Sequence, residues 1–187
     1  MVKINACVFI SGKGSNLKNL IIKSREYNFP INISLVISSN KKAEGIKHAI
    51  RNYIPYLILN TKKRNSEYKI LNALKKYKIT LICLAGYMKI ISKNFLRSFK
   101  KNIINIHPSL LPKFKGLNTY KRIIAKKERK TGCTVHFVNE QLDSGQIITQ
   151  KSFFIENYDN VETLKYKTQQ LERFAFPEAI IKIYKYS

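Results

Sequence analysis

The chain of 187 residues is long enough for one domain with a sizeable core, and its three cysteines form no C-x-x-C pair, which argues against a disulfide framework or a zinc site. No apolar run approaches the roughly 18 residues of a membrane-spanning helix, so we expect a cytoplasmic protein with no membrane partner. The formal net charge of +24 would suit nucleic acid, but its lysines are spread along a chain that is also rich in Ile and Asn, which is typical of codon-composition bias.

Strands and helices alternate through the first part of the chain. Apolar, β-branched runs predict strands over residues 2–10, 31–38, 56–60, 79–87 and 102–106. Apolar residues at helical spacing predict helices over residues 15–24, 41–52, 65–78 and 91–99. The segment 79–87 is nearly all apolar, as in a strand that is buried on both faces. This alternation predicts a mainly parallel, twisted sheet with helices on both faces, which is a Rossmann-like α/β fold.

The pattern changes after residue 115. A helix is predicted over 118–130, two strands that face each other over 132–138 and 145–155, and a long closing helix over 160–184. We therefore expect antiparallel strands in the C-terminal part. No repeat, linker or low-complexity segment divides the chain, so residues 1–187 are predicted to form a single domain.

The segment SGKGSN, residues 11–16, lies where backbone N–H groups at the start of a helix can bind an anion. Gly12 and Gly14 allow close approach to a phosphate, while Ser15 and Asn16 add donors and are expected to cap the helix. The dinucleotide fingerprint fails, because its third glycine would fall at Leu17 and no acidic residue follows the second strand; a nicotinamide-dependent oxidoreductase is thereby excluded. A phosphate cradle and a plain strand-to-helix turn remain the two interpretations of this loop.

A second polar group is predicted at the end of strand 102–106. Asn105 and His107 are two residues apart, so they share a face at the carboxyl end of the strand, where open α/β sheets bind ligands. Pro108 and Pro112 should stiffen the rim that follows. Asp143, beside a glycine turn, is a candidate partner for the imidazole.

An amide, an imidazole and a carboxylate form a plausible acyl-transfer site without a protein nucleophile. Asn105 and a protonated His107 can donate to a developing oxyanion, while Asp143 holds the ring and favours its protonated form. The alternatives are structural: Asp143 as an ordinary turn residue, and histidines that serve only the core. His48 and His136 are assigned to that structural class.

Five stretches in order resemble the glycinamide ribonucleotide formyltransferase family over nearly the whole chain. They are ISGKGSNL (10–17), ISSNKKAEGIKHA (37–49), LAGYMKIIS (84–92), NIHPSLLPKFKG (105–116) and GCTVHFVNEQLDSGQII (132–148). The resemblance implies the formyltransferase fold. It also implies transfer of a formyl group from 10-formyltetrahydrofolate, as co-substrate, to the amine of glycinamide ribonucleotide in de novo purine synthesis, with no metal.

The resemblance also implies roles for single residues. It makes Asn105, His107 and Asp143 the catalytic group. The substrate-binding residues that it implies are Gly14, Ser15 and Asn16 for the phosphate, and Glu172. The folate-binding residues that it implies are Arg64, Met88, Ile91 and Asn105, although core packing is an equal interpretation of Met88 and Ile91. Asn118 and Tyr120 stand where family members often have His, and the chain ends at Ser187, where many relatives continue.

Three other functions fit parts of this pattern less well. Formyltetrahydrofolate deformylase has an extra N-terminal regulatory domain, whereas we expect strand one to begin already at residue 4 here. Methionyl-tRNA formyltransferase has an added C-terminal tRNA-binding domain, for which we expect no room in 187 residues. A basic nucleic-acid-binding α/β module with a vestigial site would need neither the catalytic residue types nor the phosphate loop, so we expect no nucleic-acid partner. The sequence does not predict the oligomeric state.

Overall fold

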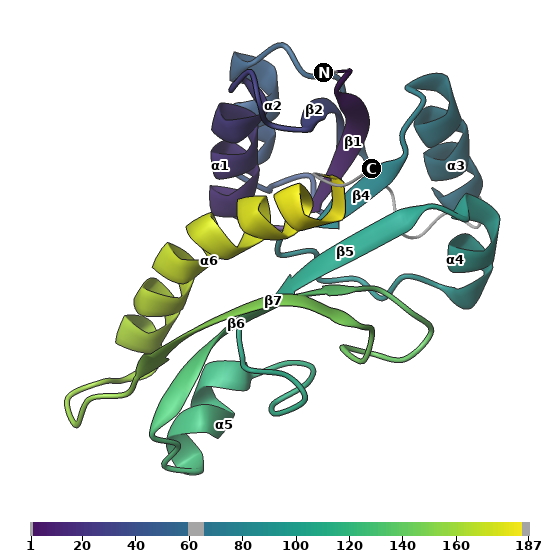
Figure 1. Cartoon of the computed structure of the whole chain (residues 1–187). Helices are drawn as coiled ribbons and strands as arrows, with labels where there is room; N and C mark the ends of the chain where they lie inside the picture. The colour runs from purple at the N-terminus through teal and green to yellow at the C-terminus, as the bar shows by residue number, and fades with distance from the viewer. Residues whose placement is uncertain (1, 60–65, 185–187) are drawn as a thin grey trace. The chain divides into compact units, whose positions relative to one another are not determined.

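The computed structural model describes residues 2–59 and 66–184 (Figure 1). The chain divides into two compact units, Met1–Ile104 and Asn105–Ser187. The strands of the described residues follow the order β3-β2-β1-β4-β5-β6-β7. The single domain predicted over 1–187 stays a prediction.

The first unit is built on parallel strands. They are β1 (Ile4–Ile10), β2 (Ile31–Ser38), β3 (Tyr56–Ile58) and β4 (Leu81–Leu84). β1 pairs with β2 on one side and with β4 on the other, and β2 pairs with β3. Residues 6–10 of β1 and all of β4 are buried, which confirms the prediction that the apolar run 79–87 contains a strand covered on both faces.

Helices cover both faces of this sheet. They are α1 (Ser15–Ser24), α2 (Ile46–Arg51), α3 (Ser66–Lys76) and α4 (Lys93–Phe99). Figure 1 shows α1 and α2 on one side of β1 and β4, and α3 and α4 on the other. Each helix buries its apolar stripe, with Leu17, Leu20 and Ile21 inside in α1 and Ile70 and Leu74 in α3. The predicted mainly parallel α/β architecture is confirmed.

The second unit carries the antiparallel strands. Strand β5 (Asn102–His107) leads into it, and α5 (Thr119–Ala125), β6 (Lys130–Phe137), β7 (Ile147–Phe154) and α6 (Val161–Tyr184) follow. β6 and β7 are antiparallel, as predicted. Helix α6 contacts both strands and buries Phe176, Ala179 and Ile180 completely.

Two predicted helices each lack five residues of their sequence pattern at one end. The helix predicted over 41–52 begins only at Ile46, because residues 41–45 form turns. The helix predicted over 118–130 ends at Ala125, since Lys127 adopts a left-handed φ of 49°, and Lys130 already belongs to β6. Of the strand predicted over 56–60, Asn60 lies outside the described residues.

One glycine sets how closely β6 and β7 approach. A Cβ added at Gly132 would lie 1.9 Å from the carbonyl oxygen of Lys151 and 2.7 Å from the Cα of Ser152, both of which are backbone atoms of the partner strand. We expect Gly132→Ala to reduce the free energy of unfolding by about 1–3 kcal/mol through overpacking, measured by urea denaturation. Gly12→Ala is the matched control, because a Cβ there meets nothing within 4 Å. Equal denaturation midpoints for the two variants would contradict this packing.

Candidate active site

The loops at the carboxyl ends of the parallel strands converge in the first unit. From β1 the chain adds β2 and β3 on one side of the sheet, and then β4 on the other side of β1. The strand order therefore reverses at β1, and doubly wound sheets bind ligands at such a switch point. The Ser11 hydroxyl, directly after β1, accepts a hydrogen bond from the backbone N–H of Met88, after β4, at 2.8 Å. It also lies 2.6 Å from the hydroxyl of Ser39, which follows β2. Hydrogen bonds therefore tie the three loops together.

The glycine loop is a tight cradle before α1. Gly14 is the residue that precedes the helix, with a left-handed φ of 76°, and a Cβ there would lie 2.6 Å from the Cα of Gly45. The carbonyl of Gly12 accepts from the N–H of Gly45 at 3.0 Å. Gly14, which has no side chain, occupies the cap position of α1, so the prediction that Ser15 and Asn16 cap the helix is wrong. The first-turn N–H groups have no acceptors within the helix, which suits an anion.

The predicted folate residues of the first unit lie after β4. Met88 is 66% exposed and Ile91 is partly buried. A side chain this exposed does not pack in the core, which argues against the core-packing interpretation of Met88. Arg64 lies outside the described residues.

The second unit brings Asn105, His107 and Asp143 together. The Nδ1 of His107 is 3.2 Å from the Oδ2 of Asp143, and its Nε2 is 2.9 Å from the carbonyl oxygen of Phe114. Both ring nitrogens therefore face acceptors, and both bonds form together only when the ring is protonated at both nitrogens. His107 is only 5% exposed, so these are interactions of a desolvated ring.

Asp143 is both a turn residue and a member of this cluster. Its left-handed φ of 46° places the carboxylate so that Oδ2 accepts from the backbone N–H of Gly116 at 2.8 Å. The side-chain amide of Asn105 points its Nδ2 toward Oδ1 at 3.5 Å, a long contact. The prediction that a turn residue in this position can orient the imidazole agrees with this geometry; its catalytic role stays a prediction.

A second histidine belongs to the cluster, although the sequence assigned it to the core. The Nε2 of His136 lies 3.2 Å from the Nδ2 of Asn105 and 3.7 Å from the Oδ1 of Asp143. Its Nδ1 lies 2.8 Å from the carbonyl oxygen of Phe137. Burial lowers the pKa of the His136 imidazole, and the bond to Phe137 opposes that shift. The sequence does contain a sign of this role: Thr134 and His136 place polar side chains on one face of an otherwise apolar strand.

The segment after His107 forms the rim that the prolines predict. The hydroxyl of Thr134 donates to the carbonyl of Ser109 at 2.6 Å and accepts from the N–H of Leu111 at 3.1 Å. The Ser109 hydroxyl donates to the carbonyl of Lys113 at 2.6 Å. These bonds hold residues 109–113 against β6.

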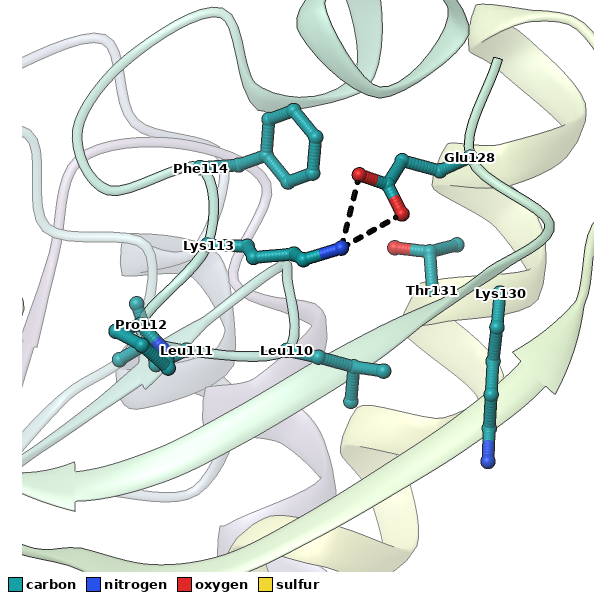
Figure 2. A pocket seen from close by; sticks show the side chains of 8 residues that line it. All are labelled: Leu110, Leu111, Pro112, Lys113, Phe114, Glu128, Lys130 and Thr131. Atoms are coloured by element: carbon teal, nitrogen blue, oxygen red, sulfur yellow. Dashed lines mark hydrogen bonds and ion pairs between the residues drawn. The ribbon is translucent and has the colours of Figure 1, made fainter. Parts of the chain in front are cut away.

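A cavity of about 340 Å³ lies beside this rim (Figure 2). Its lining residues are Leu110, Leu111, Pro112, Lys113, Phe114, Glu128, Lys130 and Thr131. The ammonium of Lys113 contacts both carboxylate oxygens of Glu128, at 3.0 and 3.1 Å (Figure 2). Asn105, His107 and Asp143 do not line this cavity, so we locate the candidate site at the polar cluster instead.

The remaining predicted residues of the second unit lie on α5 and α6. Glu172 is 8% exposed. Burial, and then the charge of Glu172, raises the pKa of the Tyr120 phenol, so the two side chains are neighbours. Asn118 is the left-handed residue that precedes α5, with its φ at 56°. The position at which the resemblance leads us to expect His in family members thus holds a phenol beside Glu172.

Residues 2–59 and 66–184 contain no group of three or more His, Cys, Asp and Glu side chains arranged to hold a metal ion. Within the same ranges, no helix combines the length and the apolar character that crossing a bilayer requires.

Comparisons with known proteins agree with this geometry. The formyl transferase family model matches residues 4–180. The chain is 40% identical to the trifunctional purine biosynthetic protein adenosine-3 of Gallus gallus, over 95% of this chain but only 18% of that protein. It is 38% identical to phosphoribosylglycinamide formyltransferase of Haemophilus influenzae, over 92% of this chain and 84% of that protein.

A solved structure extends the match to the fold. The crystal structure of phosphoribosylglycinamide formyltransferase from Brucella melitensis has a TM-score of 0.92 and 34% identity, over 100% of this chain and 97% of that chain. The resemblance and the formyltransferase fold predicted from the sequence are thus confirmed. The chain belongs to the formyl transferase family, among the phosphoribosylglycinamide formyltransferases.

Proposed function

We propose that the chain transfers the formyl group of 10-formyltetrahydrofolate to the amine of glycinamide ribonucleotide, a step of de novo purine synthesis. Membership in the family supports this proposal. Its main structural support is the distance of 3.2 Å between the Nδ1 of His107 and the Oδ2 of Asp143, beside the amide of Asn105. Desolvated donors fixed next to a proton acceptor are what an acyl transfer through an oxyanion requires.

The reaction needs no covalent enzyme intermediate. The amine nitrogen of the nucleotide attacks the formyl carbon, a new C–N bond forms, and negative charge moves onto the formyl oxygen. Collapse re-forms the carbonyl and breaks the bond from that carbon to N10 of the folate. The attacking nitrogen loses one proton and N10 gains one, so atoms and electrons balance without an oxidant or reductant.

Each member of the cluster has a distinct task in this scheme. The amide of Asn105 donates to the oxyanion. The ring of His107, with acceptors at both nitrogens, stabilises the same charge electrostatically. Asp143 accepts the amine proton through an ordered water and returns it to the leaving nitrogen, since both nitrogens of His107 already face acceptors.

The other proposed contacts bind the two substrates. Gly14, Ser15 and Asn16 hold the phosphate of the nucleotide, and Glu172 contacts the nucleotide as well. Arg64, Met88, Ile91 and Asn105 contact the folate. The high positive charge raises the local concentration of both anionic substrates without any nucleic-acid partner.

We place the protein in the cytoplasm. The support is that Cys7, Cys83 and Cys133 are buried free thiols, as expected in a reducing compartment. Burial raises the pKa of the Cys133 thiol to about 12, so it stays protonated and unreactive.

Replacement of the carboxylate tests the mechanism. We expect Asp143→Asn to reduce kcat by at least about 100-fold, because the amide cannot accept the proton. Asn tolerates the left-handed conformation at this position, so the fold should survive. Steady-state kinetics with both substrates gives kcat. Asp159→Asn, which removes a carboxylate bound to Lys167 elsewhere in the unit, is the control and should keep kcat. Equal kcat values for Asp143→Asn and Asp159→Asn would refute the mechanism.

A charge placed in the glycine loop tests the phosphate assignment. We expect Ser15→Asp to raise the KM for glycinamide ribonucleotide by at least about tenfold, because a carboxylate at the loop repels the phosphate. The matched control is Ser66→Asp, the same change at the first residue of α3. If both variants keep the wild-type KM, the loop does not bind the phosphate.

A further inference from the structure

The most buried polar side chain of the cluster is not one that the proposed mechanism uses. His136 is 2% exposed and lies on β6 behind the amide of Asn105. Its ring faces a polar atom at each nitrogen, and one of these atoms is the amide nitrogen of Asn105, the proposed oxyanion donor. The following inference rests on the proposed function.

The partners of His136 determine which of its nitrogens carries the proton. Its Nδ1 faces the carbonyl of Phe137 at 2.8 Å, and a carbonyl can only accept, so Nδ1 carries a hydrogen. Its Nε2 faces the Nδ2 of Asn105 at 3.2 Å, and an amide nitrogen can only donate, so Nε2 is unprotonated. The lowered pKa of the ring agrees with this neutral form.

Two neighbouring groups, the His136 ring and the Asp143 carboxylate, orient the Asn105 amide. The amide has two hydrogens, one bonded to His136 at 3.2 Å and the other directed at Asp143 at 3.5 Å. The first contact is within the usual range for a hydrogen bond and the second is at its limit. The second N–H can therefore exchange its weak contact with Asp143 for a hydrogen bond to the oxyanion at little energetic cost. The first N–H, bonded to His136, keeps the plane of the amide fixed.

We propose that His136 is a positioning residue for formyl transfer: its unprotonated Nε2 holds the Asn105 amide so that the second amide hydrogen is free to bind the oxyanion. A protonated His136 would instead donate to Asp143, whose Oδ1 lies 3.7 Å away, and would compete with Asn105 for it. The other charged groups that act on His136 are His107 and Lys115, and both disfavour its protonation.

The protonation pattern is measured without any catalysis. In the full chain labelled with 15N-histidine, NMR at neutral pH reports which ring nitrogen carries hydrogen for each of the three histidines. The His136 signals are assigned by their loss in the His136→Gln variant. We expect a hydrogen on Nδ1 and none on Nε2. A hydrogen on Nε2 would overturn the proposal.

Two amide substitutions separate positioning from structure. Gln reaches the place of the ring Nε2 and can accept from Asn105, whereas Asn reaches only the place of Nδ1, next to Phe137. We expect His136→Asn to lower kcat by about 10- to 100-fold with both KM values within about twofold, and His136→Gln to keep most of kcat. Thr149→Val removes a buried hydroxyl that contacts Glu178 and Lys182 on α6, and should change stability alone.

The outcomes distinguish the two proposals. Equal loss of kcat in His136→Asn and His136→Gln, or none in His136→Asn, would overturn the positioning role even where the wild type transfers formyl. A wild type without formyl transfer would refute the proposed function, while the NMR result would still decide the protonation of His136.

Discussion

The contact between His107 and Asp143 is the constraint on which the candidate site depends. It joins the end of β5 to a turn between β6 and β7, so the antiparallel pairing of those two strands must be in register for the carboxylate to arrive. Two backbone groups then fix the pair: the carbonyl of Phe114 holds the far side of the ring, and the N–H of Gly116 holds the carboxylate. The short segment 114–116 thus orients both partners at once.

The need to orient both partners also explains why residues with a left-handed backbone are concentrated around this cluster. Phe114, Gly116, Asn118 and Asp143 all have positive φ values, which are uncommon for residues other than glycine. Each of them turns the chain sharply enough to point a carbonyl, an N–H or a carboxylate into the cluster or to start α5. A hydrogen-bonded rim at residues 109–113 and a closely packed β6 and β7 support these turns. Strain of this kind is common where a rigid frame supports a functional site.

The sequence predicts the regular part of this molecule well, because periodicity reports burial directly. Each predicted strand and helix appears, and the shared face of Asn105 and His107 follows from the two-residue repeat of a strand. Helix ends at Gly45 and Lys127 were missed, since turns and left-handed residues interrupt helical spacing without changing the apolar pattern. His136 was misjudged for another reason. Alternation shows which face a side chain occupies, but not which residue of a neighbouring segment it meets.

The proposed function requires that the formyl group pass to the amine of the nucleotide rather than to water. The most direct measurement follows the carbon label of 10-formyltetrahydrofolate into formylated glycinamide ribonucleotide and into formate, with and without the nucleotide, for the wild-type chain. With the nucleotide present, we predict that the label enters formylated glycinamide ribonucleotide. With or without the nucleotide, we predict little label in formate. Formate released at the same rate with and without nucleotide would contradict transfer to the amine and indicate a hydrolase.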